Sequence, residues 1–187
     1  VQGLIDVGGI KAGQRVLING GGGSTGTLAI QIAKVFDVEV TGVDRRGKLG
    51  FMRRLGADHV MDYAEADFTR QHQRFDLIFD VKTDRSFFDY GRALAPNGTY
   101  VTVGGKTSRI LQILCLGRTM KKKRMRVVAY TANKDTGYLL AQLSAGNIKP
   151  VIDKCFPLEK TADAFRYYGE GRFRGKVVVT MGEGMGL

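Results

Sequence analysis

The residues best suited to bind a ligand in this sequence are a run of four glycines at 20–23 and the small residues that follow it. Three glycines here fit the pattern G-x-G-x-x-G, namely Gly21, Gly23 and Gly26. In this pattern the first glycine lets a turn close, the second lets a pyrophosphate approach the backbone, and the third lets a helix lie against a strand. A helix that starts here offers phosphates unpaired N–H groups and about half a positive charge. We therefore expect a pyrophosphate at Gly22, Gly23, Ser24 and Thr25.

The elements around the glycines decide what they mean. An apolar, β-rich run at 15–19 leads into them, and an amphipathic run at 27–36 leads out. Strand, tight turn and helix in this order are the context in which the glycine pattern indicates dinucleotide binding rather than an ordinary turn.

The acidic residue Asp44 ends the second β-rich run, close to the roughly 20 residues after the first glycine at which such a fold places its ribose ligand. A carboxylate there accepts a hydrogen bond from the 2′-hydroxyl of NAD and repels the 2′-phosphate of NADP. Arg45, Arg46 and Lys48 follow at once, however, and guanidinium groups suit a phosphate dianion. The cofactor is therefore NAD(P)(H) with a slight lean to NADP(H), on the hypothesis that Asp44 pairs with a neighbouring arginine and turns away from the ribose.

Strands and helices alternate along the chain. The predicted strands are 15–19, 38–43, 59–61, 75–81, 99–103 and 126–130, and the predicted helices are 27–36, 49–55, 67–73, 87–94 and 136–145. Pro96, Asn97 and Gly98 predict a turn. The alternation predicts an α/β fold, a Rossmann doubly wound parallel sheet of about six strands. The apolar run at 110–116 lies outside the alternation and fits either core packing or the wall of a substrate cleft.

The pattern changes after Pro150. A strand at 151–156, a helix at 158–168 and a strand at 176–180 predict a small C-terminal β-α-β return segment.

The formal net charge of +11 makes nucleic acid a partner to consider. The positive residues are spread along the chain, and the one dense run, at 121–124, lacks the interleaved aromatic residues of a single-strand binder. A solvated basic loop is the favoured interpretation, and we predict no nucleic-acid partner.

The remaining composition favours a cytoplasmic protein. No apolar run approaches the roughly 20 residues that span a bilayer, so no membrane partner is predicted. The two cysteines, Cys115 and Cys155, are too few for a disulfide framework or a zinc site, so we predict a reducing compartment and no metal.

Several short motifs fall in one order along the chain, at residues 19–26 with 31–34, 55–60, 62–63, 79–81, 94–99, 103–105, 146–153 and 174–178. Together they resemble the medium-chain dehydrogenase/reductase superfamily, in particular its zinc-free branch of quinone-oxidoreductase-like proteins. In that family a GroES-like catalytic domain precedes the cofactor domain, and the C-terminal return belongs to it. The resemblance implies that residues 1–147 are an NAD(P)-binding domain and that residues 148–187 belong to a catalytic domain otherwise absent from this sequence.

The resemblance also implies an activity. Such enzymes pass hydride between the nicotinamide of NAD(P)(H) and a quinone, an enone or an alcohol/aldehyde pair, and the cofactor carries the chemistry. It implies an NAD(P)-dependent oxidoreductase, alcohol dehydrogenase-like or quinone reductase-like, of which this chain alone is predicted to be inactive. No catalytic residue is named; Lys176 is either close to the cofactor or an ordinary surface lysine.

Further site residues follow from the same resemblance. Tyr63 is expected near the adenosine ribose. The carboxyl ends of two strands are expected to line the nicotinamide side, with Asp80, Val81, Val103, Gly104 and Gly105. Two positions depart from the family: Asp44 stands where NADPH-dependent relatives often have Ser, Thr or Arg, and Lys82-Thr83 stands where relatives have Val-Gly or Gly.

Relatives form homodimers through the last strand of the cofactor sheet, which implies a homodimer through residues 126–130. Two other hypotheses stay open: a non-catalytic NAD(P)-binding module or sensor, and a basic nucleic-acid-binding domain.

Overall fold

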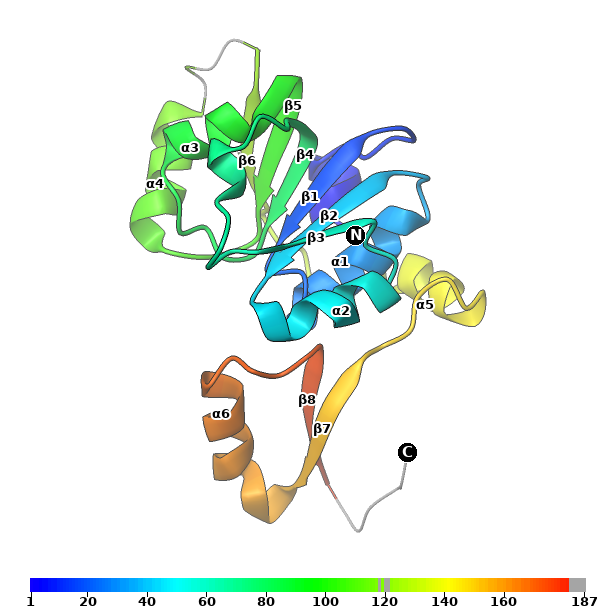
Figure 1. Ribbon diagram of the computed structural model, residues 1–187. Helices are drawn as coiled ribbons and strands as arrows, with labels where there is room; N and C mark the ends of the chain where they lie inside the picture. The colour runs from blue at the N-terminus through cyan, green and yellow to red at the C-terminus, as the bar shows by residue number, and fades with distance from the viewer. Residues whose placement is uncertain (118, 120–121, 182–187) are drawn as a thin grey trace.

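One parallel sheet organises the structure. The computed structural model describes residues 1–117, 119 and 122–181. In these residues six strands form this sheet: β1 (Arg15–Asn19), β2 (Glu39–Asp44), β3 (His59–Asp62), β4 (Phe75–Asp80), β5 (Leu94–Thr102) and β6 (Arg124–Val127). Their order across the sheet is β3-β2-β1-β4-β5-β6, so the chain crosses over between β3 and β4 (Figure 1). The predicted Rossmann sheet is confirmed.

Helices cover the sheet on both faces. They are α1 (Ser24–Lys34), α2 (Arg46–Arg54), α3 (Phe87–Ala93) and α4 (Thr107–Leu116), with a π-helix η1 (Gly3–Val7) and a 3₁₀-helix η2 (Phe68–Arg70). Successive β1 side chains enter different hydrophobic clusters: Val16 and Ile18 pack with residues of α1, and Leu17 packs with residues of α3 and α4. Burial on both faces explains why the strands are continuous apolar runs rather than alternating ones.

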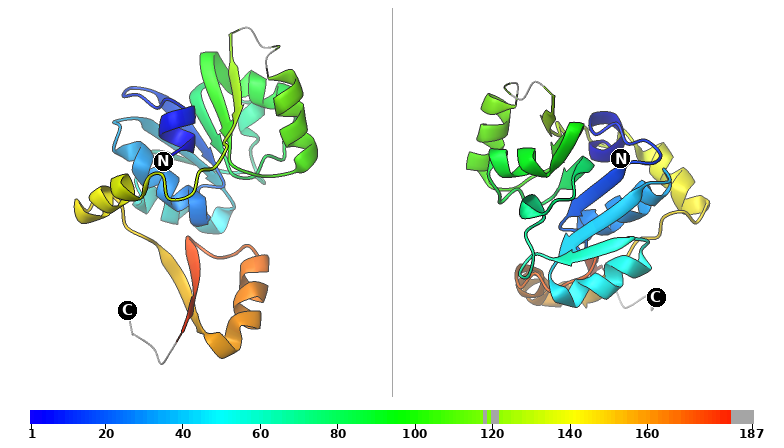
Figure 2. Two further views of the ribbon diagram at one scale, coloured as in Figure 1. Left: turned by 180° about the vertical axis from the view of Figure 1, so that it is seen from behind. Right: turned by 45° about the horizontal axis from the view of Figure 1, so that its top comes forward.

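The C-terminal part forms the expected β-α-β unit. After α5 (Thr136–Ser144) come β7 (Ile152–Pro157), the 3₁₀-helix η3 (Leu158–Lys160), α6 (Thr161–Gly169) and β8 (Lys176–Thr180), with β7 and β8 paired in parallel. Figures 1 and 2 place α5 beside α1. The chain entering this unit is held by Gln31 of α1, whose Oε1 accepts from the Lys149 N–H at 2.8 Å and whose Nε2 donates to the Lys149 carbonyl at 3.1 Å.

Three local predictions are wrong. The turn signal at 96–98 lies inside β5, where Asn97 has a φ of 65° and the pairing register with β4 shifts; the signal marks a bulge rather than the end of a strand. The helix at 67–73 is only η2, three residues long. The sixth strand begins at Arg124 instead of residue 126, because Met125 is buried against the sheet while Tyr130 is 78% exposed.

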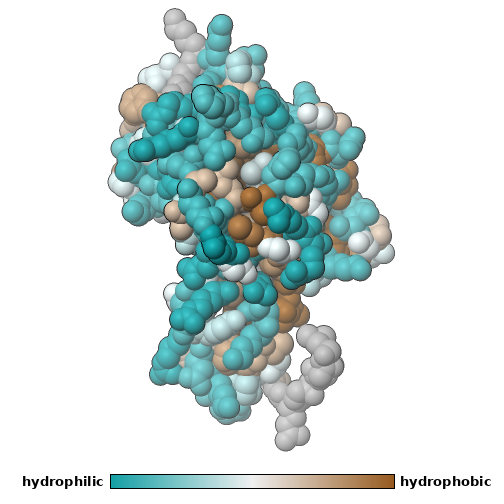
Figure 3. Space-filling model, viewed as in Figure 1, coloured by the Kyte–Doolittle hydropathy of each residue, from teal (hydrophilic) through white to brown (hydrophobic). Residues whose placement is uncertain are grey.

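The run at 110–116, for which core packing and a cleft wall were the two alternatives, contributes one residue to the core, and its Ile113 and Leu114 line a cavity described below. It forms most of α4, in which Ile113 is the buried residue, while Leu111 and Leu114 are 54% and 60% exposed. Because the apolar residues of α4 are distributed around the helix, few of them can face the sheet at once. Figure 3 shows further apolar surface in the middle of the face in view, between the sheet and the C-terminal unit.

Candidate cofactor site

The glycine loop joins β1 to α1 in a tight turn tied to the neighbouring strand. The N–H groups of Gly20 and Gly21 both donate to the Val43 carbonyl of β2, at 2.9 and 3.1 Å. Gly20 has a φ of 84°, a conformation that favours glycine and that the fingerprint did not assign. Gly23 then occupies the N-cap of α1 in an extended conformation, so no N-cap side chain satisfies the first N–H groups of the helix.

Imagined Cβ atoms separate the roles of the fingerprint glycines. A Cβ on Gly26 would lie 2.1 Å from the Gly20 carbonyl oxygen and 2.5 Å from the Gly21 Cα, so helix and loop backbones touch there. A Cβ on Gly23 would meet only the Gly20 oxygen, at 3.4 Å. The space over Gly23 is therefore open, as close approach of a pyrophosphate requires, and the cradle fits a dinucleotide.

Asp44 is turned into the protein. It is 6% exposed; its Oδ2 accepts from the Gly22 N–H at 3.0 Å and its Oδ1 from the Arg45 N–H at 2.8 Å. Its cationic neighbour is Lys48, whose Nζ lies 3.9 Å from Oδ1. The hypothesis that Asp44 pairs with an arginine is therefore wrong, because Arg46 reaches instead to Asp62 at the end of β3 and to Glu65 after it.

Lys48 lies beneath the loop rather than in the exposed basic cluster. It is 4% exposed, and its ammonium sits 4.9 Å from the ring centroid of Phe173. Burial lowers the pKa of this ammonium, and the Asp44 carboxylate partly opposes that effect. A Cβ on Gly22 would collide with the Lys48 side chain, which explains the extra glycine of the run.

A pocket of about 240 Å³ opens at the carboxyl ends of β1, β2, β3 and β4. It brings together the predicted residues Asp44 and Tyr63, and Tyr63 is 46% exposed. The full lining is Asn19, Gly20, Val43, Asp44, Tyr63, Lys82, Asp84 and Arg85. Five lining residues were not predicted from the sequence: Asn19, Val43, Lys82, Asp84 and Arg85. They lie in the last residues of β1 and β2 or in the segment that follows β4, and that place is the signal that could have found them.

Asp80 is used inside the protein. It is 0% exposed and accepts from Asn19 Nδ2 and the Tyr100 hydroxyl, each at 2.8 Å, and from the N–H groups of Lys82 and Thr83 at 2.9 and 3.0 Å. Burial and the Asp80 charge raise the pKa of Tyr100 far above its ordinary value, so this hydroxyl stays protonated and donates. Asp80 therefore fixes the backbone after β4, which carries Val81, rather than offering its own carboxylate to a ligand.

The C-terminal unit touches the glycine loop. The Gly175 N–H donates to the Gly22 carbonyl at 3.3 Å, and Lys176 Nζ lies 3.2 Å from Ser24 Oγ. Arg174 donates to the Gly47 carbonyl at 3.1 Å. Lys176 therefore places a cation at the N-terminus of α1. Of its two interpretations, this favours the one close to the cofactor over an ordinary surface lysine.

Three further features concern metal ligands, membrane-spanning helices and the two cysteines. Across residues 1–117, 119 and 122–181, no group of three or more His, Cys, Asp or Glu residues could hold a metal ion. In the same part of the chain, no helix is long and apolar enough to cross a membrane. Cys115 and Cys155 are free and exposed.

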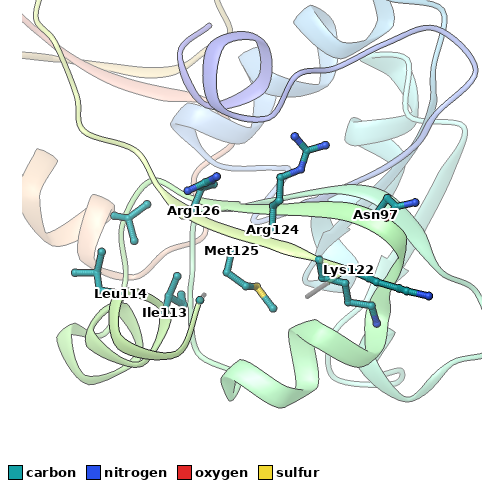
Figure 4. Close-up of a pocket in the computed structure, with 10 residues that line it drawn as sticks. Asn97, Ile113, Leu114, Lys122, Arg124, Met125 and Arg126 are labelled. Carbon is teal, nitrogen blue, oxygen red and sulfur yellow. The ribbon is translucent and has the colours of Figure 1, made fainter. Parts of the chain in front are cut away.

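A larger cavity, about 870 Å³, lies away from the strand ends, between α4 and β6 (Figure 4). Its lining combines apolar side chains such as Ile113 and Met125 with basic ones such as Lys122 and Arg124. Most of the basic run at 121–124 falls here, although Lys121 is outside the described residues. This cavity is unrelated to the glycine loop.

Comparison with known proteins agrees with this geometry. A family model described as zinc-binding dehydrogenase matches residues 55–179. The chain belongs to this family. The matching relatives place it in the medium-chain dehydrogenase/reductase superfamily, among quinone-oxidoreductase-like proteins, as the motifs predicted.

Two curated relatives and one solved structure illustrate the match. The chain is 30% identical to the 2-methylene-furan-3-one reductase of Solanum lycopersicum over 91% of the chain and 41% of the relative, and 30% identical to the mitochondrial NAD(P)H oxidoreductase RTN4IP1 of Homo sapiens over 90% and 48%. The structure of the quinone oxidoreductase from Coxiella burnetii superposes on 97% of the chain and 56% of that protein, with a TM-score of 0.82 and 26% identity. The chain thus spans about half the length of the curated relatives it matches.

Proposed function

We propose that this chain is the cofactor-binding part of an NAD(P)H-dependent oxidoreductase that acts on a quinone, an enone or an alcohol/aldehyde pair. The observation that carries the proposal is the open backbone at Gly23, at the start of α1, with Lys176 beside it. The printed names of the relatives, an NAD(P)H oxidoreductase, a quinone oxidoreductase and a furanone reductase, support the reaction class. When bound, the nicotinamide supplies the hydride chemistry.

The chain's own residues bind and orient the two halves of the cofactor. The N–H groups of the first turn of α1, from Ser24 to Gly26, take the pyrophosphate, because those of Gly21 to Gly23 already donate inside the protein. Lys176 adds a positive charge that both NAD and NADP would use. The pocket at the ends of β1 to β4 takes the adenosine, with Tyr63 on its wall. Val81, Val103, Gly104 and Gly105, at the ends of β4 and β5, line the nicotinamide side.

The contacts that Asp44 makes inside the protein support the lean to NADP(H). Both of its oxygens already accept N–H groups, and Lys48 lies close enough to offset its charge. A 2′-phosphate near β2 would therefore meet less repulsion than a free carboxylate creates. Arg45 is the ligand we assign to it: among the described residues its guanidinium has no carboxylate partner within 4 Å, whereas Arg46 is already paired.

Titration of the chain with NADPH and NADH tests the function and the cofactor choice together. We expect one saturable site per chain and tighter binding of NADPH. Clear preference for NADH would overturn the assignment to NADP(H), and binding of neither would overturn the function.

We also propose that the boundary lies near residues 147 and 148, that the protein works in the cytoplasm without metal, and that it has no nucleic-acid or membrane partner. A homodimer through the edge of β6 completes the proposal. Within the described residues β6 pairs only with β5, and a free parallel edge needs a partner. Arg124 and Arg126 point the same way, away from Met125 (Figure 4). An antiparallel, two-fold pairing would therefore gather the arginines of both copies on one face.

A further inference from the structure

Thr83 has an unusual backbone for its residue type. It is 0% exposed and has a φ of 46°. A β-branched residue in this left-handed region is an outlier, and such strain persists where the surroundings determine the conformation, often at functional sites. Because glycine would adopt this conformation without strain, the threonine side chain is the feature that needs a reason.

The strained backbone is held from below by Asp80. The Thr83 N–H donates to Asp80 Oδ1 at 3.0 Å, next to the donation from Lys82 at 2.9 Å. Asp80 is itself fixed by side chains of the neighbouring strands, Asn19 of β1 and Tyr100 of β5. The position of Thr83 is thus set by three adjacent strands of the sheet.

The Thr83 side chain in turn holds the turn that follows β5. Its hydroxyl lies 2.5 Å from the Gly104 carbonyl oxygen, to which it donates, and 2.5 Å from Thr102 Oγ1. Gly105 has a φ of 137°, and a Cβ there would lie 2.4 Å from the Thr83 Cβ. The turn of Gly104 and Gly105 therefore rests directly on this side chain.

We propose that Thr83 is a positioning residue for the nicotinamide half of the cofactor, acting through the backbone of Gly104 and Gly105. This inference rests on the function proposed above, because that function places the nicotinamide at the ends of β4 and β5. The hydroxyl does not touch the cofactor. It fixes the position of the Gly104 and Gly105 backbone, against which the nicotinamide ring lies. The adenosine half binds in the pocket at the ends of β1 to β4, which the turn of Gly104 and Gly105 does not line. Lys82 and Asp84 of that pocket flank Thr83, but Asp80 holds this backbone through N–H groups that a change of the Thr83 side chain leaves in place.

The test compares a whole dinucleotide with its adenosine-side fragment. NADPH is paired with 2′,5′-ADP, and NADH with 5′-ADP, and each Kd is measured by calorimetry on the chain. Thr83→Val removes the hydroxyl at nearly constant shape, and Thr83→Ser keeps it. Thr83→Gly removes the hydroxyl and also relieves the backbone strain, so it serves should the valine variant fold poorly. Thr99→Val is the matched control, a buried threonine inside β5, three residues before Thr102.

We expect Thr83→Val and Thr83→Gly to bind NADPH about tenfold more weakly, the effect of about one hydrogen bond, with binding of 2′,5′-ADP unchanged. The fluorescence of the bound NADPH nicotinamide should also change in these two variants. Thr83→Ser should keep the wild-type affinity and fluorescence, and Thr99→Val should leave the Kd of both ligands unchanged. Equal weakening of both ligands, or wild-type affinity in both hydroxyl-free variants, would overturn the role of Thr83. Failure of the wild-type chain to bind any of the four ligands would instead overturn the proposed function itself.

Discussion

Alanine substitutions at two fingerprint glycines should separate packing from ligand binding. At Gly26 a Cβ would lie 2.1 Å from the Gly20 oxygen and 2.5 Å from the Gly21 Cα, and backbone atoms of the loop cannot swing aside as a side chain would. Overpacking costs about 1–3 kcal/mol, and contacts this short belong at the upper end. The helix gains about 1 kcal/mol when alanine replaces glycine, which leaves a net loss of about 2 kcal/mol.

At Gly23 the expectation is reversed. Its extended backbone suits alanine, and the nearest atom to the Cβ is the Gly20 oxygen at an ordinary 3.4 Å. The free energy of unfolding should change by less than about 1 kcal/mol. The methyl group would, however, stand where the pyrophosphate approaches. Loss of one charge-assisted hydrogen bond to a phosphate costs about 1.5–3 kcal/mol, so the Kd for NADPH should rise about 10- to 100-fold.

Thermal melts and calorimetric titrations of both variants form the assay. Gly26→Ala should lower Tm by about 4–8 °C, while Gly23→Ala should melt within about 4 °C of the wild type. Gly50→Ala, on the exposed face of α2 where the Cβ meets nothing closer than 3.9 Å, is the control and should raise stability without changing affinity. A Gly23→Ala variant that binds NADPH like the wild type would refute the placement of the pyrophosphate.

Four further predictions follow from the same geometry. Arg45→Gln should weaken NADPH binding about 10- to 100-fold and leave NADH binding unchanged, since only NADPH carries the 2′-phosphate; equal losses in two titrations would exclude the assignment. Lys176→Met should weaken both cofactors alike, by about tenfold, because both share the pyrophosphate; a loss confined to one of them would contradict the role. The dimer fraction in sedimentation velocity should rise with salt, because screening relieves the repulsion between the β6 arginines of two copies; a monomer at every salt concentration would remove the β6 interface. Ser86→Ala breaks the capping box of α3 and should lower the free energy of unfolding in urea by about 1 kcal/mol at neutral pH. The Ser86 hydroxyl lowers the pKa of the Asp89 carboxyl, so its stabilising effect is present above the unfolded-state pKa and is lost as the pH falls. The deficit of the variant should therefore shrink below about pH 4, and a constant deficit would argue against the cap.

The sheet could be predicted well because its strands are buried on both faces. Apolar runs located β1 and β4, and a valine-rich run located β2, each within a residue or two. Signals that depend on local conformation failed. Asn97 has a turn-like φ but lies inside a strand, and the sequence could not distinguish the two because bulges and turns use the same residue types. At the edge strand β6, half of the side chains face outward, and the apolar pattern lost its boundary.

The site was predictable as a position but not as a set of pairings. The spacing of Gly21, Gly23, Gly26 and Asp44 located the loop and the strand end correctly in the sheet. It could not show that Asp44 is satisfied by a loop N–H and Lys48, because which of three adjacent cations reaches a carboxylate depends on helix phase. Nor could spacing show that residues 173–176 lie against the glycine loop from the far end of the chain.

Hydrogen–deuterium exchange of the chain with and without saturating NADPH tests the central claim most directly. The structure predicts slower exchange in the backbone amides of residues 20–26 and in the loops that follow β2, β4 and β5, with no change at the cavity between α4 and β6. Unchanged exchange at residues 20–26, or protection at that cavity instead, would contradict the claim that the glycine loop binds the dinucleotide.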